Sequence, residues 1–253
     1  MMYSFYSGGD SVLHRLDPRV KLLAAGAGIA GTLLFNDPAV LLPMFAATIL
    51  YGRFLGGIPV RRQMHLLKPL LPLVAITVVL WPVIYEPRLK GLVLGVSFSF
   101  RLLTIALFTF VLLMTTPQKE LVLAFVKLGM PYEFGLTVSI ALRYIPTLYL
   151  LASKIMDAQK SRGWEVEKGN VFVRVKRMSA VLIPLLVASL KTAHELSIAL
   201  ESRGFGAGRK RTALYDIRMT RRDFVAAGIV LLLFIAAVYV RYVLGFGHID
   251  IYG

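Results

Sequence analysis

Two short motifs contain residue types that can make a directed ionic contact. Each places an arginine between a serine and a glycine, followed by a large aromatic residue, near the end of a predicted amphipathic helix. Glycine just past a helix, with a cation in the last turn, is ordinary C-terminal capping chemistry. Two such ends also favour a second interpretation, because a capped end holds a guanidinium forward to bind a partner's carboxylate. The residues are Ser161, Arg162, Gly163 and Trp164, then Ser202, Arg203, Gly204 and Phe205.

Two other motifs resemble catalytic signatures but lack residues that the chemistry requires. The run GFGAGRKRT at 204–212 has no lysine directly after the second required glycine of a phosphate loop, and no strand precedes it. In AHELS, at 193–197, the position of the second zinc-binding histidine is taken by Ile198. We therefore expect this chain to bind no ATP and no metal, to need no cofactor of its own, and to have no enzyme activity.

Arg101 lies inside an apolar run, VSFSFRLLTIAL. About ten residues into a helix, at 1.5 Å each, place it roughly 15 Å deep, near the middle of a membrane span. A central arginine costs about 2.5 to 3.5 kcal/mol and normally faces a partner or water. One interpretation is hydrogen bonding within the chain, to carbonyls or to Ser97, Ser99 and Thr104. The other is contact with a membrane-embedded partner.

Small residues near the start of the chain recur at a spacing that lets helices approach closely. Gly26 stands four residues before Ala30, and Gly28 four before Thr32. Such small residues on one helix face bring backbones together in membranes. Most patterns of this kind serve internal packing. Gly26 and Ala30 are nevertheless candidates for contact with the same membrane-embedded partner.

The composition is that of an all-α polytopic membrane protein. Of the 253 residues 57% are hydrophobic, and the mean hydropathy is +0.70, outside the range of soluble domains. The absence of cysteine excludes disulfides and thiolate metal sites. Asp17 is expected to cap a helix that opens at Pro18. Five stretches approach the roughly 20 apolar residues that a span needs: residues 20–36, 39–56, 66–85, 91–115 and 223–244.

The positive charge follows the predicted topology. Most of the 29 Lys and Arg fall in residues 1–19, around 57–65 and in 116–222. Arg88, Lys90 and Arg241 remain at the opposite ends of the spans. Cytoplasmic loops carry such an excess, so the N-terminus and 116–222 are expected in the cytoplasm and the C-terminus outside. This topology accounts for the net charge of +15 without nucleic acid. No cleavable signal peptide is expected.

The region 116–222 is too polar to span the membrane and too apolar to be free in solution. Its apolar run 178–190 is short for a crossing, and apolar residues then continue at helical spacing. We expect two or three long amphipathic helices beneath the membrane. Pro146 and Pro184 each lie within a repeated Ile-Pro-x-Leu pattern and are expected to kink these helices.

Taken together, these motifs resemble the transmembrane T component of energy-coupling factor (ECF) transporters. The resemblance rests on LHRLDPRVKLL at 13–23, LMTTPQKELVLAFVKLGMPYEFGLTVSIALRYIP at 113–146, both Ser-Arg-Gly ends and GRKRT at 208–212. It implies that Arg162 and Arg203, within Ser161–Gly163 and Ser202–Gly204, each insert into a groove on one of two ABC-type ATPases. ATP and Mg would be bound by those partners.

The resemblance also implies a function and a division of the chain. ATP-driven closure of the ATPases would move the coupling helices, and these would topple a substrate-binding S component that imports a vitamin or a transition-metal ion. Arg101, Gly26 and Ala30 become candidate contacts with that S component. The expected parts are a four-helix membrane region at 1–115, coupling helices at 116–222, and a last span with an external tail at 223–253. The alternatives are a self-contained carrier or channel and a membrane-anchored scaffold.

Overall fold

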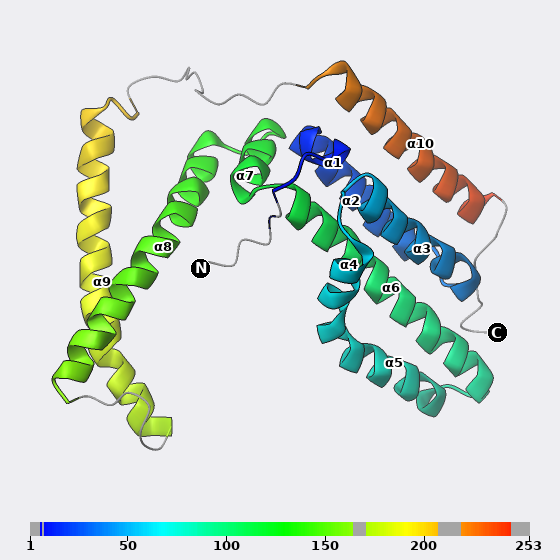
Figure 1. Ribbon diagram of the computed structural model, residues 1–253, viewed down its shortest axis with the longest axis horizontal. Helices are drawn as coiled ribbons and strands as arrows, with labels where there is room; N and C mark the ends of the chain where they lie inside the picture. Colours follow the sequence, from blue (N-terminus) through cyan, green and yellow to red (C-terminus); the bar gives the residue numbers. More distant parts are fainter. Residues whose placement is uncertain (1–5, 7, 164–170, 207–218, 244–253) are drawn as a thin grey trace. The chain divides into compact units, whose positions relative to one another are not determined.

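The computed structural model describes Tyr6, residues 8–163, 171–206 and 219–243, with side chains omitted for 171–177. The described residues form helices and turns without a strand (Figure 1). This confirms the predicted all-α class. Contacts divide the chain into two units: residues up to Met130 together with the last helix, and Pro131–Asp216. The predicted boundary at 116 therefore differs from this grouping, which keeps residues 116–130 with the first unit.

The first unit opens with three helices whose starts are fixed by local chemistry. They are α1 (Val12–Arg15), α2 (Pro18–Leu34) and α3 (Pro38–Phe54). Asp17 and Asp37 precede the prolines, and each carboxylate accepts a hydrogen bond from the second backbone N–H of its helix, at 2.9 Å. The cap predicted for Asp17 is thus confirmed. Proline suits the first position, because the N–H that it lacks would have no helical partner there.

The remaining helices of the first unit pack around one long helix. They are α4 (Val60–Leu67), the 3-10 turn η1 (Lys68–Leu70), α5 (Leu71–Ile84), α6 (Arg88–Thr115), α7 (Gln118–Lys127) and α10 (Arg221–Tyr242). Helix α6 contacts α2, α3, α4 and α5, while α7 and α10 both pack against α2. A buried core of Leu13, Ile58, Val111 and Met114 joins α1, the α3–α4 turn and the end of α6.

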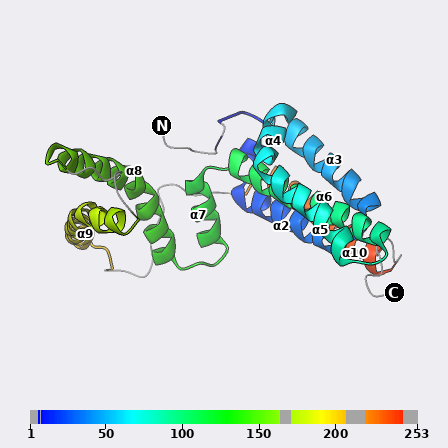
Figure 2. The same ribbon diagram turned by 90° about the horizontal axis from the view of Figure 1, so that it is seen from below.

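The second unit consists of two long helices, α8 (Tyr132–Ser161) and α9 (Val171–Ser202). They contact each other near the end of α8, where the Gln159 side chain donates to the Ala180 carbonyl at 3.4 Å. Figure 1 shows the two helices crossing, and Figure 2 shows them side by side. Pro146 and Pro184 lie inside helices that continue on both sides of them.

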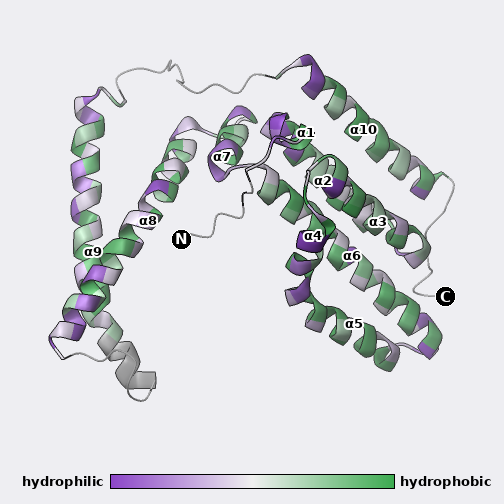
Figure 3. Cartoon of the chain, viewed as in Figure 1, coloured by the Kyte–Doolittle hydropathy of each residue, from purple (hydrophilic) through white to green (hydrophobic). Residues whose placement is uncertain are grey.

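Among the described residues, five helical stretches are long and apolar enough to cross a membrane: 60–84, 88–115, 132–161, 178–202 and 221–242. Three of them match predicted spans. The other two are α8 and the apolar part of α9, which the sequence assigned to the cytoplasmic side. Conversely, α2 and α3 have 17 residues each, about 25 Å of helix. Figure 3 shows α5 and α10 as mainly apolar, whereas polar residues recur along α8 and α9.

Candidate functional site

The first Ser-Arg-Gly motif closes α8 with a tight helix cap. Arg162 is the C-cap residue, and its backbone N–H donates to the Gln159 carbonyl. Gly163 takes a φ of +81° and donates to the Lys160 carbonyl at 2.9 Å. Glycine adopts this left-handed conformation without the penalty of a side chain. The Arg162 side chain is exposed; Trp164 lies outside the described residues.

The second motif closes α9 in the same way, and here the whole cap is described. Gly204, with a φ of +75°, donates to the Glu201 carbonyl at 2.9 Å. The Phe205 N–H donates to the Leu200 carbonyl, also at 2.9 Å. These two bonds form a Schellman motif. Arg203 occupies the same C-cap position as Arg162 and is likewise exposed. The capping interpretation is therefore confirmed for both ends.

The serines and arginines of the motifs have different partners. Ser161 Oγ donates to the Asp157 carbonyl at 3.1 Å, and Ser202 Oγ to the Ala199 carbonyl at 3.0 Å. Each serine thus satisfies a carbonyl of its own last turn. Within the described ranges, neither guanidinium has an ion pair or a side-chain hydrogen bond. Both arginine residues are exposed.

The two arginines do not form one site. Arg162 follows Gln159, which contacts α9 at Ala180, whereas Arg203 follows the opposite end of α9 (Figure 1). Ser202 follows Ala180 by 22 positions, which is roughly 33 Å along the helix at 1.5 Å per residue. The two motifs are thus well separated along the α8–α9 pair.

Arg101 is bound within the chain. Its Nη2 donates to the Phe35 carbonyl at 2.6 Å and to Asn36 Oδ1. Its guanidinium carbon also lies 4.9 Å above the centre of the Phe98 ring, which stacks on Trp81. The interpretation of Arg101 as bonded to carbonyls is therefore confirmed, although Ser97, Ser99 and Thr104 donate to their own helix instead. This arrangement provides no evidence for a self-contained carrier.

The small residues of α2 divide between two faces. A Cβ atom on Gly28 would lie 2.5 Å from Phe108 of α6, so this glycine allows α2 and α6 to approach closely. Gly26 is exposed, and a Cβ on it would meet nothing within 4 Å. Ala30 is partly exposed. Gly28 therefore serves internal packing, while Gly26 remains on the surface.

Sequence reasoning missed a set of buried polar residues where α2, α6 and α10 meet. Lys21, Thr115 and Asp223 are each at most 3% exposed. Lys21 and Thr115 also line a small cavity, with room for about one water molecule. The signal was present in the sequence as a lysine and an aspartate at the ends of apolar helices. Their pairing across the chain depends on the fold.

Comparison with known proteins agrees with these features. The profile of the CbiQ family, described as cobalt transport protein, matches residues 9–214. The energy-coupling factor transporter transmembrane protein EcfT of Acidaminococcus fermentans is 32% identical, covering 94% of this chain and 95% of its own. The EcfT protein of Lacticaseibacillus paracasei is 36% identical over 90% and 94%, and that of Bacillus subtilis 34% over 88% and 91%. The chain therefore belongs to the CbiQ family, as the transmembrane T component of an energy-coupling factor transporter.

Proposed function

We propose that the chain transmits ATP-driven movement from two ABC-type ATPase subunits to a membrane-embedded S component that carries the substrate. The observation that carries this proposal is the pair of capped helix ends. Each holds an exposed arginine at the same position, and the two lie at opposite ends of the α8–α9 pair. In the proposed complex each ATPase subunit binds one of the two arginines. The planar guanidinium can bind a carboxylate through two parallel hydrogen bonds.

The length of the helices supports a mechanical role. Helices of 30 and 32 residues extend about 45 and 48 Å. Because they cross and contact each other near Gln159, displacement of one end moves the partner helix as well. Closure of an ATPase pair on ATP binding would thereby change the angle or position of both helices.

An exposed apolar surface on α9 supports contact with the S component. Five neighbouring side chains are 49 to 70% exposed. A patch of this kind on a helix that also carries exposed Lys191, Glu195 and Glu201 favours a protein or membrane contact over water. In the proposed complex this patch supports the S component, which binds a vitamin or a transition-metal ion. The five residues are Leu182, Ile183, Leu186, Val187 and Leu190.

In the proposed complex the partner ATPases bind ATP and Mg and hydrolyse the ATP, and this chain does neither. In that complex the N-terminus and both arginine ends lie in the cytoplasm and the C-terminus outside. This orientation is supported by the concentration of basic residues in 1–19, 57–65 and 116–222. Under this orientation α8 and α9 act as coupling helices at the cytoplasmic side, although their length and composition would also permit a crossing.

Co-purification in mild detergent tests the docking ends. Wild type and Arg162→Glu/Arg203→Glu are compared for recovery of the host's ABC-type ATPases by quantitative mass spectrometry. The matched control is Lys154→Glu/Lys191→Glu, which makes the same charge change at exposed positions on the same helices. Loss of one partner of a buried charge pair costs about 2 to 5 kcal/mol, so only the arginine variant should lose the ATPases. Equal recovery with both variants would move the interface elsewhere. No ATPase with wild type would refute the transporter function.

A further inference from the structure

Asp223 ties the start of α10 to the start of α2. One carboxylate oxygen, Oδ1, accepts from the backbone N–H of Asp17 at 2.8 Å. The other, Oδ2, accepts from both the N–H and the hydroxyl of Thr220, each at 2.7 Å. The side chains of Asp17 and Asp223 are almost fully buried. A hydrogen bond to a buried charged group is of the stronger kind, so this contact fixes two helix starts that are far apart in sequence.

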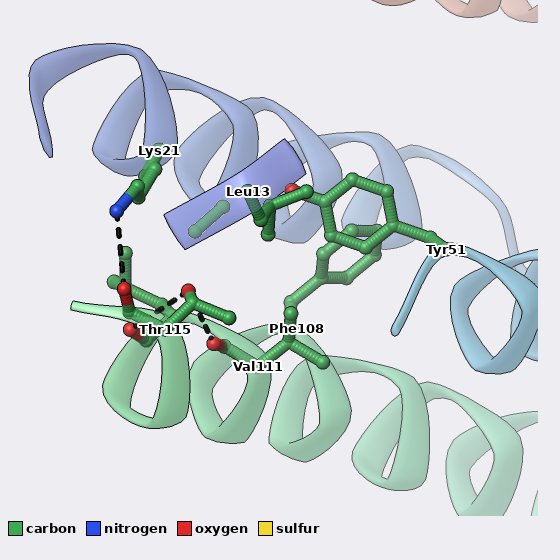
Figure 4. A pocket seen from close by; sticks show the side chains of 8 residues that line it. Leu13, Lys21, Tyr51, Phe108, Val111 and Thr115 are labelled. Atoms are coloured by element: carbon green, nitrogen blue, oxygen red, sulfur yellow. Dashed lines mark hydrogen bonds between the residues drawn. The ribbon is translucent and has the colours of Figure 1, made fainter. Parts of the chain in front are cut away.

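Lys21 ties the same part of α2 to the end of α6. Its ammonium donates to the carbonyl of Thr115, the last residue of α6, at 3.0 Å and to that of His14 at 3.3 Å. Figure 4 shows the lysine reaching across to Thr115 beside the small cavity. Cations are favourable near the C-terminus of a helix. We call Asp17, Lys21, Thr115 and Asp223 the root cluster.

The root cluster lies within the first unit, at the end of α6 and the start of α10, which flank the second unit along the chain. The chain passes from α6 through α7 into the second unit at Pro131 and returns to the first unit shortly before Thr220. Thr115 precedes the outgoing connection, and Asp223 follows the returning one. Helix α7, on the outgoing connection, also packs on α2. Thr115 at the end of α6 and Asp223 at the start of α10, which we call the two attachments of the coupling helices, are therefore both bonded to the start of α2.

Local stability alone does not explain this arrangement. Thr220 suffices to cap α10 together with the Asp223 carboxylate, and α6 would end at Thr115 without a lysine from another helix. The additional bonds run between helices, over sequence separations of 206 and 94 residues. Burying Lys21 and Asp223 has a large desolvation cost, which only good partners offset.

We propose that the root cluster is a positioning site that makes the two attachments of the coupling helices move as one with α2. This inference rests on the proposed function. When ATPase closure displaces α8 and α9, a fixed spacing between the attachments passes the displacement to the membrane helices. When the cluster is broken, the end of α6 and the start of α10 move separately. Less substrate is then transported for each ATP hydrolysed.

The first test measures the spacing directly. Because the chain has no cysteine, spin labels can be placed at Gln118→Cys and Arg222→Cys, exposed positions beside each attachment. The labelled full chain is assembled with its ATPases and S component in lipid nanodiscs, and pulsed electron paramagnetic resonance gives the distance distribution. We expect one narrow distribution in the parent and a broad one in Asp223→Ala.

Two further variants distinguish the hydrogen bond between Asp223 and the Asp17 N–H from the local capping of α10 by Thr220. Thr220→Ala removes only the hydroxyl bond to Asp223 and should keep the narrow distribution. Asp223→Asn retains an oxygen acceptor for the Asp17 N–H, so its distance distribution should be much narrower than that of Asp223→Ala. If Asp223→Ala does not assemble, Lys21→Met breaks the second tie and is expected to broaden the distribution too. Unchanged distributions in Asp223→Ala and Lys21→Met would overturn the proposal, as would equal broadening in Thr220→Ala.

The second test measures substrate uptake per ATP hydrolysed by the same complexes in proteoliposomes. We expect this ratio to fall at least about fivefold in Asp223→Ala, the lower range of typical coupling between sites, with ATPase recovery unchanged. An unchanged ratio would overturn the positioning role. Absence of ATP-dependent uptake in wild type would instead refute the proposed function, and the distance measurement would still report on the tie.

Discussion

At the scale of single residues, three arginines show how surroundings decide the role of one side chain. Arg162 and Arg203 lie at helix C-caps, exposed and without an ion pair in the described part of the chain. Arg101 has its guanidinium against the turn between α2 and α3. Counting residues along α6 put Arg101 near the middle of a span. Its partners lie in the turn between α2 and α3, because α2 ends opposite the middle of α6.

Replacing Arg101 by leucine tests this assignment. Arg101→Leu leaves the Phe35 carbonyl and the Asn36 side chain without their donor, so we expect a loss of about 1 to 3 kcal/mol in stability. The lower unfolding temperature would be measured by thermal denaturation in detergent. Arg101→Lys, which keeps a donor, should lose less. We expect S-component affinity to be undiminished, and a clear drop without loss of stability would support the contact with that partner.

The glycines of α2 provide a second residue-scale prediction. In Gly28→Ala the new methyl group would overlap the Phe108 ring, and displacing a packed ring typically costs about 1 to 3 kcal/mol. Gly26→Ala is the matched control, since it meets open space. Thermal unfolding should therefore separate the two variants. Equal stability would show that Phe108 moves aside freely. A bulky Gly26→Leu should reduce S-component binding if that exposed face forms the contact.

At the scale of elements, local chemistry was predictable and pairing was not. The five predicted spans overlap α2, α3, α5, α6 and α10, because long apolar runs and Asp-Pro starts act within a few residues. The caps at Gly163 and Gly204 were predictable for the same reason. The 3-10 turn that separates α4 from α5 was missed, since Leu66 and Leu67 at the end of α4 were counted in the predicted span 66–85. The Arg101–Asn36 contact was also missed, because a separation of 65 residues gives no local pattern.

The glycine caps yield a prediction about the docking ends. Alanine at Gly204 must adopt a left-handed conformation, which costs about 1 to 2 kcal/mol. We therefore expect Gly204→Ala to fray the end of α9 and weaken ATPase capture severalfold while the arginine itself is retained. Binding of purified ATPases to the variant in nanodiscs would measure this. Gly228→Ala in α10, where φ is ordinary and a Cβ meets nothing within 4 Å, should bind as wild type. Equal capture by both would show that cap geometry is irrelevant to docking.

At the scale of the whole molecule, the chain combines a packed membrane unit with a separate pair of long helices. From the sequence we divided the chain into 1–115, 116–222 and 223–253 by predicted spans and coupling helices, and this division remains a prediction. Grouping by contacts places α7 with the first unit because α7 packs on α2. Such a boundary depends on contacts between distant segments. Composition likewise leaves α8 and α9 ambiguous, since both are long and apolar enough to cross.

Thiol labelling of the cysteine-free chain tests the proposed orientation. Leu89, at the start of α6, is 79% exposed, and Phe54, at the end of α3, is 77% exposed. With the N-terminus inside, a membrane-impermeant maleimide should label Leu89→Cys in intact cells. Phe54→Cys should react only after the cell membrane is permeabilised. The reverse pattern would invert the topology and place the arginine ends outside, away from any cytoplasmic ATPase.

The separation of the two arginine ends has a consequence for the symmetry of the complex. Two identical ATPase subunits would pair about a twofold axis, but one T chain offers them two unlike ends. Lys160 precedes the first Ser-Arg-Gly motif, and Glu201 precedes the second. In the proposed complex a single copy of this chain therefore occupies both ATPases and makes them inequivalent, even when their sequences are identical. Each ATPase can then contribute differently to the movement of the coupling helices. Two different ATPase proteins would also assemble in one preferred orientation, since each would bind the end that it fits.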